Sequence, residues 1–191
     1  FLSGNLKRVE FKKNIRQSIF HNTKISTTLF LKRVIETEFP GALLETVVFR
    51  GRVIKSDFKF AHFNYVEFYD FIINSSFASA YLYQVKFYSE LKDNRFNFAT
   101  LDEVKFLKKI HRSIFANTHL QKVKFAEEIF NSIFDYALFF EVTFRKNITS
   151  VNFLNINLRQ SKFEGEIYHC NFSFSNLNGI NFSKEIMNTK F

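Results

Sequence analysis

The sequence predicts an all-β parallel solenoid, and three observations lead to that prediction. Phenylalanine supplies 29 of the 191 residues, while tryptophan is absent. These phenylalanines recur at spacings that alternate between ten and nine, which defines a period of 19 residues. Between them lie further large apolar residues, so the apolar spacing within one period is 5, 5, 4 and 5. A spacing near five fits neither a helix nor a long strand, and it indicates a coil with four short sides.

Two phenylalanines mark each period without a missing member. The series is Phe1, Phe11, Phe20, Phe30, Phe39, Phe49, Phe58, Phe68, Phe77, Phe87, Phe96, Phe106, Phe115, Phe125, Phe134, Phe144, Phe153, Phe163, Phe172, Phe182 and Phe191. One aromatic residue repeated at one position predicts one structural niche repeated along the chain.

Two further columns complete each coil. The first is Leu6, Ile25, Leu44, Phe63, Leu82, Leu101, Leu120, Phe139, Leu158 and Leu177. The second is Ile15, Val34, Val53, Ile72, Leu91, Ile110, Ile129, Ile148, Ile167 and Ile186. Small or β-branched residues stand two positions before most of these large ones, for example Ala80 before Leu82. We expect both kinds of residue to point inward and the remaining positions to face solvent. Stacked coils would then form columns of equivalent side chains.

Four segments of the chain resemble the pentapeptide-repeat family. Ser161–Gly165 and Ser175–Gly179 read as its small-polar-Leu/Phe-x-Gly unit, and Ala80–Leu82 and Ala99–Leu101 match its Ala-x-Leu core. The resemblance implies a right-handed quadrilateral β-helix, here a single solenoid over residues 1–191 of about ten coils of 19 residues. The family usually has twenty residues per coil, so one side is shortened here. Another right-handed β-helix with a 19-residue coil is the alternative.

Two further hypotheses concern the origin of the chain. The sequence begins at Phe1, within the repeat, which suggests a piece of a longer protein. The unbroken phenylalanine columns would also fit an engineered sequence.

The sequence lacks recognisable catalytic chemistry. Cys170 is the only cysteine, which excludes an intrachain disulfide and a cysteine-rich metal site. His62 and His119 occupy equivalent positions three coils apart, roughly 14 Å, which is too far to share a metal. Cys170 lies beside His169, but its place in a small inward column favours a core residue over a nucleophile. We therefore expect no enzyme activity, metal, cofactor or small-molecule substrate.

Membrane and export signals are also missing from the sequence. It contains no apolar run long enough to span a bilayer and no recognisable signal peptide. Together with the single cysteine, these features slightly favour a cytoplasmic location.

One outward region of the first three coils is strongly basic. It comprises Lys12, Lys13, Lys32, Arg33, Arg50 and Arg52, named here the basic patch, in a chain of net charge +9. Farther along the same side the sign alternates between coils, as in Lys108 and Lys109 followed by Glu127 and Glu128. The basic patch is either a solvated face or a docking site for an acidic protein or another polyanion.

Outward aromatic residues recur on every second coil. They are Phe60, Phe98, Tyr136 and Phe174, named here the aromatic column, with Ser79, Asn117 and Asn155 between them. This side has few charges, namely Lys24, Lys59 and Asp135. The column either covers a corner of the solenoid itself or contacts a partner protein or a second copy of the chain.

These features favour a non-catalytic interaction scaffold that binds a protein through a flat face of the solenoid. The first alternative is a structural segment of a longer fibre or surface assembly. The second is polyanion binding by the basic face. Some members of the family that the chain resembles mimic duplex DNA with an acidic surface, and the net charge of +9 disfavours that role here.

Overall fold

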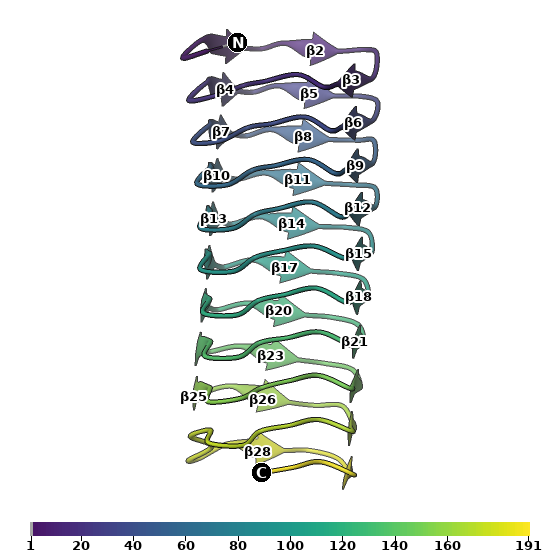
Figure 1. The fold of residues 1–191 in the computed structure, drawn as a ribbon, viewed down its shortest axis with the longest axis vertical. Helices are drawn as coiled ribbons and strands as arrows, with labels where there is room; N and C mark the ends of the chain where they lie inside the picture. The colour runs from purple at the N-terminus through teal and green to yellow at the C-terminus, as the bar shows by residue number, and fades with distance from the viewer. Residues whose placement is uncertain (1) are drawn as a thin grey trace.

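Short strands follow one another along residues 2–191, which are the residues described by the computed structural model, in nine sets of three and a last set of two. Within these residues there are 29 strands of two or three residues each and no helix. Accordingly, nothing in this part of the chain forms a helix that could cross a membrane. Figure 1 shows the strands stacked as columns along the rod, from the N-terminus at the top to the C-terminus at the bottom.

The strands form three parallel sheets, each of which is one side of the rod. Sheet A contains β1 (Asn5–Lys7), β4 (Lys24–Ser26), β7 (Leu43–Glu45), β10 (His62–Asn64), β13 (Tyr81–Tyr83), β16 (Thr100–Asp102), β19 (His119–Gln121), β22 (Leu138–Phe140) and β25 (Asn157–Arg159). Sheet B contains β2 (Glu10–Phe11), β5 (Leu29–Phe30), β8 (Val48–Phe49), β11 (Glu67–Phe68), β14 (Lys86–Phe87), β17 (Lys105–Phe106), β20 (Lys124–Phe125), β23 (Thr143–Phe144), β26 (Lys162–Phe163) and β28 (Asn181–Phe182). Sheet C contains β3 (Ile15–Arg16), β6 (Val34–Ile35), β9 (Val53–Ile54), β12 (Ile72–Ile73), β15 (Leu91–Lys92), β18 (Ile110–His111), β21 (Ile129–Phe130), β24 (Ile148–Thr149), β27 (Ile167–Tyr168) and β29 (Ile186–Met187).

The fourth side is held by single parallel bridges instead of strands. Asp57, for example, bridges Glu38 in the preceding coil and Ser76 in the following one. In all four sides a residue pairs with its equivalent 19 positions away, as Phe87 does with Phe106. The predicted all-β solenoid of about ten coils of about 19 residues is therefore confirmed.

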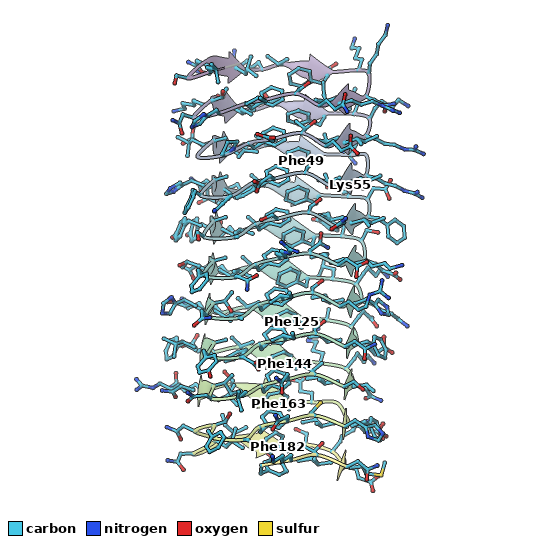
Figure 2. The ribbon with its side chains drawn as sticks, viewed as in Figure 1. Phe49, Lys55, Phe125, Phe144, Phe163 and Phe182 are labelled. Carbon is cyan, nitrogen blue, oxygen red and sulfur yellow. The ribbon has the colours of Figure 1, made fainter. Side chains whose placement is uncertain are left out.

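The phenylalanines form two internal columns, as predicted. Phe96 and Phe106 are fully buried, and each stacks on its equivalents at ring-centroid distances of 4.7–5.0 Å. Figure 2 shows Phe49, Phe125, Phe144, Phe163 and Phe182 of one column stacked along the rod. Toward the rod's ends the columns are less covered, and Phe191 is 60% exposed.

The two columns contact each other edge to face. Phe96 and Phe106 lie 5.9 Å apart with their ring planes at 90°, and Phe106 and Phe115 repeat this contact at 5.7 Å and 89°. In this geometry the positive edge of one ring meets the negative face of another, a favourable arrangement for aromatic pairs. An aliphatic side chain could fill the same volume but could not make this contact, so the packing explains why both positions are phenylalanine.

Three of the four corners in each coil use the left-handed backbone region. In the fourth coil these corner residues are Phe60, Tyr65 and Asn74, with φ of 60°, 56° and 51°. Their amides each donate to a carbonyl of the next coil, at N···O distances of 3.1, 3.2 and 2.9 Å. This conformation costs a non-glycine residue about 1 kcal/mol, and the backbone hydrogen bonds offset that cost.

The remaining corner explains the shortened side. Only three residues separate the inward Phe68 of sheet B from the inward Ile72 of sheet C, and none of the three has a positive φ. The amide of Tyr69 instead donates to the carbonyl of Phe49 in the preceding coil at 2.9 Å. This side is one residue shorter than the others because its corner turns without a residue in the left-handed region.

A buried polar column lies beside the fourth side. It comprises Thr37, Ser56, Ser75, Asn94, Ser113 and Ser132, named here the hydroxyl column after its five hydroxyl members. The hydroxyl of Ser75 accepts from the amide of Ser56 at 3.1 Å and donates to the carbonyl of Ile73 at 3.1 Å. In the next coil Asn94 Oδ1 accepts from the amide of Ser75 at 2.9 Å. These side chains are small, as the sequence indicates, and they also supply an acceptor to buried amides.

Cys170 occupies the equivalent position near the C-terminal end. Its thiol is buried and donates to the carbonyl of Tyr168 at 3.3 Å. Burial raises the pKa of this thiol from 9.0 to about 11, because the apolar surroundings disfavour the thiolate. The neighbouring His169 is exposed, so the predicted core role of Cys170 agrees with the structure.

Replacing Phe106 with alanine should lower the free energy of unfolding by about 3–5 kcal/mol, through lost burial and a cavity between stacked rings. Chemical denaturation followed by circular dichroism measures this change. Phe98→Ala is the matched control, since Phe98 is 63% exposed and its loss should change stability by less than about 1 kcal/mol. Equal effects at both positions would contradict the packing described here.

Stability should fall between pH 9 and pH 11 because of Cys170. Above pH 9.0 the unfolded chain loses the thiol proton while the folded chain keeps it to about pH 11, which favours unfolding. The expected loss is up to about 3 kcal/mol. Cys170→Ser keeps a small hydrogen-bonding group in the column and should remove this component of the pH dependence. Parallel denaturation curves for both proteins measure it, and identical pH profiles would contradict it.

Candidate functional site

The aromatic column lies on a corner of the solenoid, between the bridged side and sheet A. Phe60, Phe98, Tyr136 and Phe174 are 54%, 63%, 51% and 87% exposed. All four have left-handed φ values, from 59° to 60°. The sequence predicted that these side chains face outward on alternate coils, but it did not show that the backbone beneath them is a corner.

Aromatic residues at left-handed corners concentrate in this one column. Within residues 2–191, 28 non-glycine residues have a positive φ, and five of them are phenylalanine or tyrosine. Four of the five form the aromatic column. The fifth, Tyr65, lies at a different corner and packs edge-on against Tyr83 at 5.8 Å. The other corner residues are mostly polar, the kinds of side chain that adopt this region more readily.

A shallow groove crosses the coils between Phe60 and Phe98. Its lining is nearly symmetric about one coil, whose residues Ser76, Ala78 and Ser79 form the middle. Three residues line each side of that coil, and Ile114 lies beyond them at the C-terminal end. The three residues are Asp57, Lys59 and Phe60 on the N-terminal side, and Arg95, Asn97 and Phe98 on the C-terminal side. The side chains of the floor are small, two of them serines, and each rim carries an aromatic ring.

Charges at the rims of the groove were not part of the sequence prediction for this face. Asp57 and Arg95 come one residue before an inward phenylalanine, whereas the prediction considered only positions after it. Lys59 was predicted to lie here, and its Nζ lies 5.0 Å from the ring centroid of Phe60. The face therefore combines aromatic side chains with a few charges of both signs.

The basic patch is partly neutralised by acids that the sequence prediction did not count. Lys12 lies 3.8 Å from Glu10 of sheet B, and Arg52 lies 3.7 Å from Asp70 in the next coil. Arg50 lies over the ring of Tyr69, at 4.2 Å from the centroid. The other three members, Lys13, Lys32 and Arg33, are exposed and have no ion-pair partner among residues 2–191. The six residues do lie on one corner of consecutive coils, and four of them, Arg50 included, have no ion-pair partner among residues 2–191.

A second basic feature appears on sheet B. Lys86, Lys105 and Lys124 pair directly in adjacent strands and are named here the lysine column. Lys86 contacts Glu67 at 3.1 Å, whereas Lys105 and Lys124 have no ion-pair partner in the described residues. They line a groove with Lys122, whose ammonium lies 3.9 Å from Glu103. Stacked like charges destabilise a sheet, so this column has no evident role in folding.

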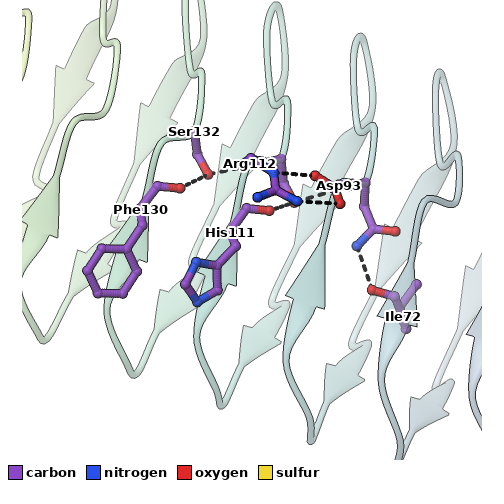
Figure 3. A network of polar contacts seen from close by, with 8 residues as sticks. Ile72, Asp93, His111, Arg112, Phe130 and Ser132 are labelled. Carbon is purple, nitrogen blue, oxygen red and sulfur yellow. Dashed lines mark hydrogen bonds and ion pairs between the residues drawn. The ribbon is translucent and has the colours of Figure 1, made fainter.

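Other charged residues form structural pairs across one coil. Arg112 donates two hydrogen bonds to Asp93, at 2.7 and 2.9 Å (Figure 3). These hydrogen bonds lower the pKa of the Asp93 carboxyl. Lys109 and Glu128 lie 3.3 Å apart, which fits the charge alternation seen in the sequence. Pairs of this kind neutralise the surface and leave little charge for a ligand.

Glu67 is the centre of a small cluster at the end of the lysine column. Burial alone would raise the pKa of its carboxyl, but hydrogen bonds from Tyr69, Lys86 and Tyr88 outweigh burial and lower it. The rings of Tyr69 and Tyr88 stack at 4.5 Å. All donors point at one carboxylate, so the cluster stabilises the corner between sheets B and C.

Within residues 2–191 no group of three or more histidine, cysteine or acidic residues is placed to hold a metal ion. His62 contacts the ring of Tyr81 at 6.0 Å, and His111 stacks on Phe130 at 5.0 Å. The surface therefore offers grooves and columns as its candidate binding features.

The geometry defines a repeat protein of the parallel β-solenoid class. Solved structures similar to it are pentapeptide repeat proteins. One is HetL from the cyanobacterium Nostoc sp. strain PCC 7120, described as involved in heterocyst differentiation regulation. It has 12% identity and a TM-score of 0.48, over 100% of this chain and 88% of that one.

Another similar structure is a trypsin-treated variant of QnrB1, a plasmid-mediated fluoroquinolone resistance protein. It has 15% identity and a TM-score of 0.28, over 99% of this chain and 90% of that one. A third is Rfr23 from the cyanobacterium Cyanothece 51142, with 11% identity and a TM-score of 0.20 over 64% and 84%. No family model and no curated protein sequence matches the chain.

Proposed function

We propose that the chain is a non-catalytic scaffold that binds a protein through the aromatic column and the groove beside it. The observation that carries the proposal is the concentration of exposed aromatic rings at left-handed corners. Asparagine and glycine suit such corners better, and the same column holds Asn22, Gly41, Asn117 and Asn155 in other coils. Aromatic residues here cost the fold some stability and gain little from packing, because each of the four is more than half exposed.

Binding by this surface has a clear physical basis. Aromatic side chains are enriched among the residues that dominate interface energies, since they bury a large area with few rotatable bonds. The backbone beneath the column is already fixed by hydrogen bonds to the next coil, as at Phe98, whose amide donates to Ala116 at 3.1 Å. Binding would therefore lose little conformational entropy.

Changing Phe98 and Tyr136 together to asparagine should weaken partner binding about thirty-fold, or roughly 2 kcal/mol, and leave the melting temperature unchanged or slightly higher. The measurement is quantitative affinity capture from an extract of the source cell, combined with thermal melting. Tyr65→Asn is the matched control, because it removes an exposed corner aromatic outside the column. Unchanged capture with a lower melting temperature would show that the column serves the solenoid's own packing.

Polyanion binding is the second candidate function, and the two unpaired members of the lysine column favour it. Lys105 and Lys124 face solvent in adjacent strands, and the fold itself supplies them no counter-charge within the described residues. Lys32 and Arg33 of the basic patch are exposed in the same way. An anionic ligand would relieve the repulsion between such neighbours, and its affinity would depend on salt.

Heparin affinity tests this candidate by titration at several salt concentrations. The wild-type affinity should fall about tenfold between 50 and 200 mM salt, as expected for two or three ionic contacts. Lys105→Ser with Lys124→Ser, or Lys32→Ser with Arg33→Ser, should weaken binding and flatten the salt dependence. The control is Lys109→Ser with Arg112→Ser, which removes the same charge from ion-paired positions. Equal effects from all three pairs would show that net charge alone governs binding.

A further inference from the structure

The groove between Phe60 and Phe98 carries a pattern of charge that the fold does not use. Asp57, Ser76 and Arg95 are consecutive members of the bridged side, so an acid and a base flank a neutral coil. They lie two coils apart, about 10 Å along the rod at the usual strand spacing. The corner residues repeat the pattern, with Phe60 and Phe98 flanking Ser79.

Arg95 and Asp57 differ from the paired charges elsewhere on the surface. Glu36 with Lys55, Asp93 with Arg112 and Lys122 with Glu103 each form a contact across one coil. Arg95 is exposed and has no ion-pair partner among residues 2–191. Asp57 accepts one local hydrogen bond, from the amide of Lys59 at 3.0 Å. Both side chains are thus available to a partner whose charges are spaced two coils apart.

We propose that this partner is a second copy of the chain, bound antiparallel about a two-fold axis that crosses the rods at the coil of Ser79. The inference rests on the proposed function, because it names the occupant of the same surface. A two-fold axis requires that each surface be complementary to itself. The groove meets that requirement, since Asp57 and Arg95 carry opposite charges, and Phe60 and Phe98 carry equivalent rings, at equal distances from the central coil. Lys59 on the N-terminal rim then faces the partner's neutral Asn97.

The two-fold axis fixes which residues meet. Asp57 faces the partner's Arg95, and Phe60 faces the partner's Phe98, so each dimer has two ion pairs and two aromatic pairs. Ser79 lies on the axis opposite the partner's Ser79. Small side chains at this central coil allow the two rods to approach closely. Farther out, His21 faces the partner's Asp135, and Glu38 faces the partner's Ile114.

Neighbouring registers satisfy the surface less well. An axis half a coil closer to the C-terminus places Asp57 opposite the partner's Ile114, and an axis a full coil closer places Arg95 against the partner's Arg95. Half a coil in the other direction pairs Arg95 with the partner's Glu38, but it leaves Asp57 opposite the partner's Ser76 and separates the rings. Of these axes, only the one at Ser79 pairs the rings of Phe60 and Phe98 and the charges of Asp57 and Arg95 at once.

Sedimentation equilibrium of wild type and charge variants tests the proposal. Wild type should dimerise at micromolar concentration, whereas Asp57→Arg and Arg95→Asp, each measured alone, should weaken self-association at least tenfold. A 1:1 mixture of the two variants should restore dimers, because both ion pairs re-form between unlike chains. Native mass spectrometry would identify these dimers as heterodimers. The double variant carrying both changes should dimerise like wild type.

Glu38→Arg is the matched control for the register. Because it keeps Asp57 and Arg95, it should dimerise alone like wild type. Weakened self-association of Glu38→Arg that a mixture with Arg95→Asp restores as heterodimers would overturn the axis at Ser79 in favour of the neighbouring register. Circular dichroism melting of every variant checks that folding is intact.

A crosslink gives a second measurement that does not depend on the charge variants. In a Cys170→Ser background, Ser79→Cys should form a disulfide-linked dimer on oxidation, because the two thiols meet at the axis. Asn117→Cys faces the partner's Gly41 and should not. Crosslinking of both or of neither would overturn the register.

A wild type that stays monomeric up to about 100 µM would overturn the second copy as the occupant, since a specific interface of this kind should associate below that concentration. The proposed function is tested separately. It is wrong if the double variant Phe98→Asn with Tyr136→Asn captures the cellular partner as well as wild type does.

Discussion

The edge-to-face contact between two columns of phenylalanine is the interaction on which the rest of this solenoid depends. Each ring stacks on the coils above and below it and meets the other column at nearly a right angle, as Phe96 does with Phe106 at 90°. Both contacts require the same coil size at every level, because a coil one residue longer would move a ring out of its column. The 19-residue period therefore follows from the packing, and the backbone ladder of the three sheets stays in register along the whole rod.

A core defined this strictly leaves the outward positions free to vary. Much of the surface uses that freedom for neutral pairing across adjacent coils, as Asp93 and Arg112 show. The corners are more restricted, since three of the four need a left-handed residue and most hold polar side chains. Two groups of residues depart from these patterns of charge pairing between coils and polar residues at corners. The aromatic column departs from the corner preference, and the lysine column departs from charge pairing between neighbouring strands.

Much of the fold could be predicted from the sequence, because periodic inward residues report the coil directly. The four sides, the inward columns and the burial of Phe96, Phe106 and Cys170 all follow from spacing. Spacing does not distinguish a corner from the middle of a side, so the left-handed conformation of Phe98 was not foreseen. Spacing also does not predict the hydrogen bonds of a small side chain. The hydroxyl of Ser75 accepts a hydrogen bond from the buried amide of Ser56 in addition to packing in the interior. The candidate sites were predictable only as sets of outward residues. Ion pairs such as Arg52 with Asp70 join adjacent coils, and they depend on side-chain conformations that the sequence pattern does not contain.

The rigidity of the stacked coils connects this packing to the proposed binding of a partner. Outward side chains of a flexible surface would adjust their spacing to a partner, whereas here the stacked coils set the separation of Phe60 and Phe98 at two strand spacings, about 10 Å. The opposite charges of Asp57 and Arg95 have the same fixed separation on the adjoining side. Under the proposed function a partner would have to present complementary groups at that distance, and a misplaced partner would gain neither the aromatic contact nor the ion pair. The specificity of the proposed binding would then come from the register of the coils, which is determined by the phenylalanine columns inside. The same internal contact that fixes the fold thus also fixes the spacing of the surface that the fold presents.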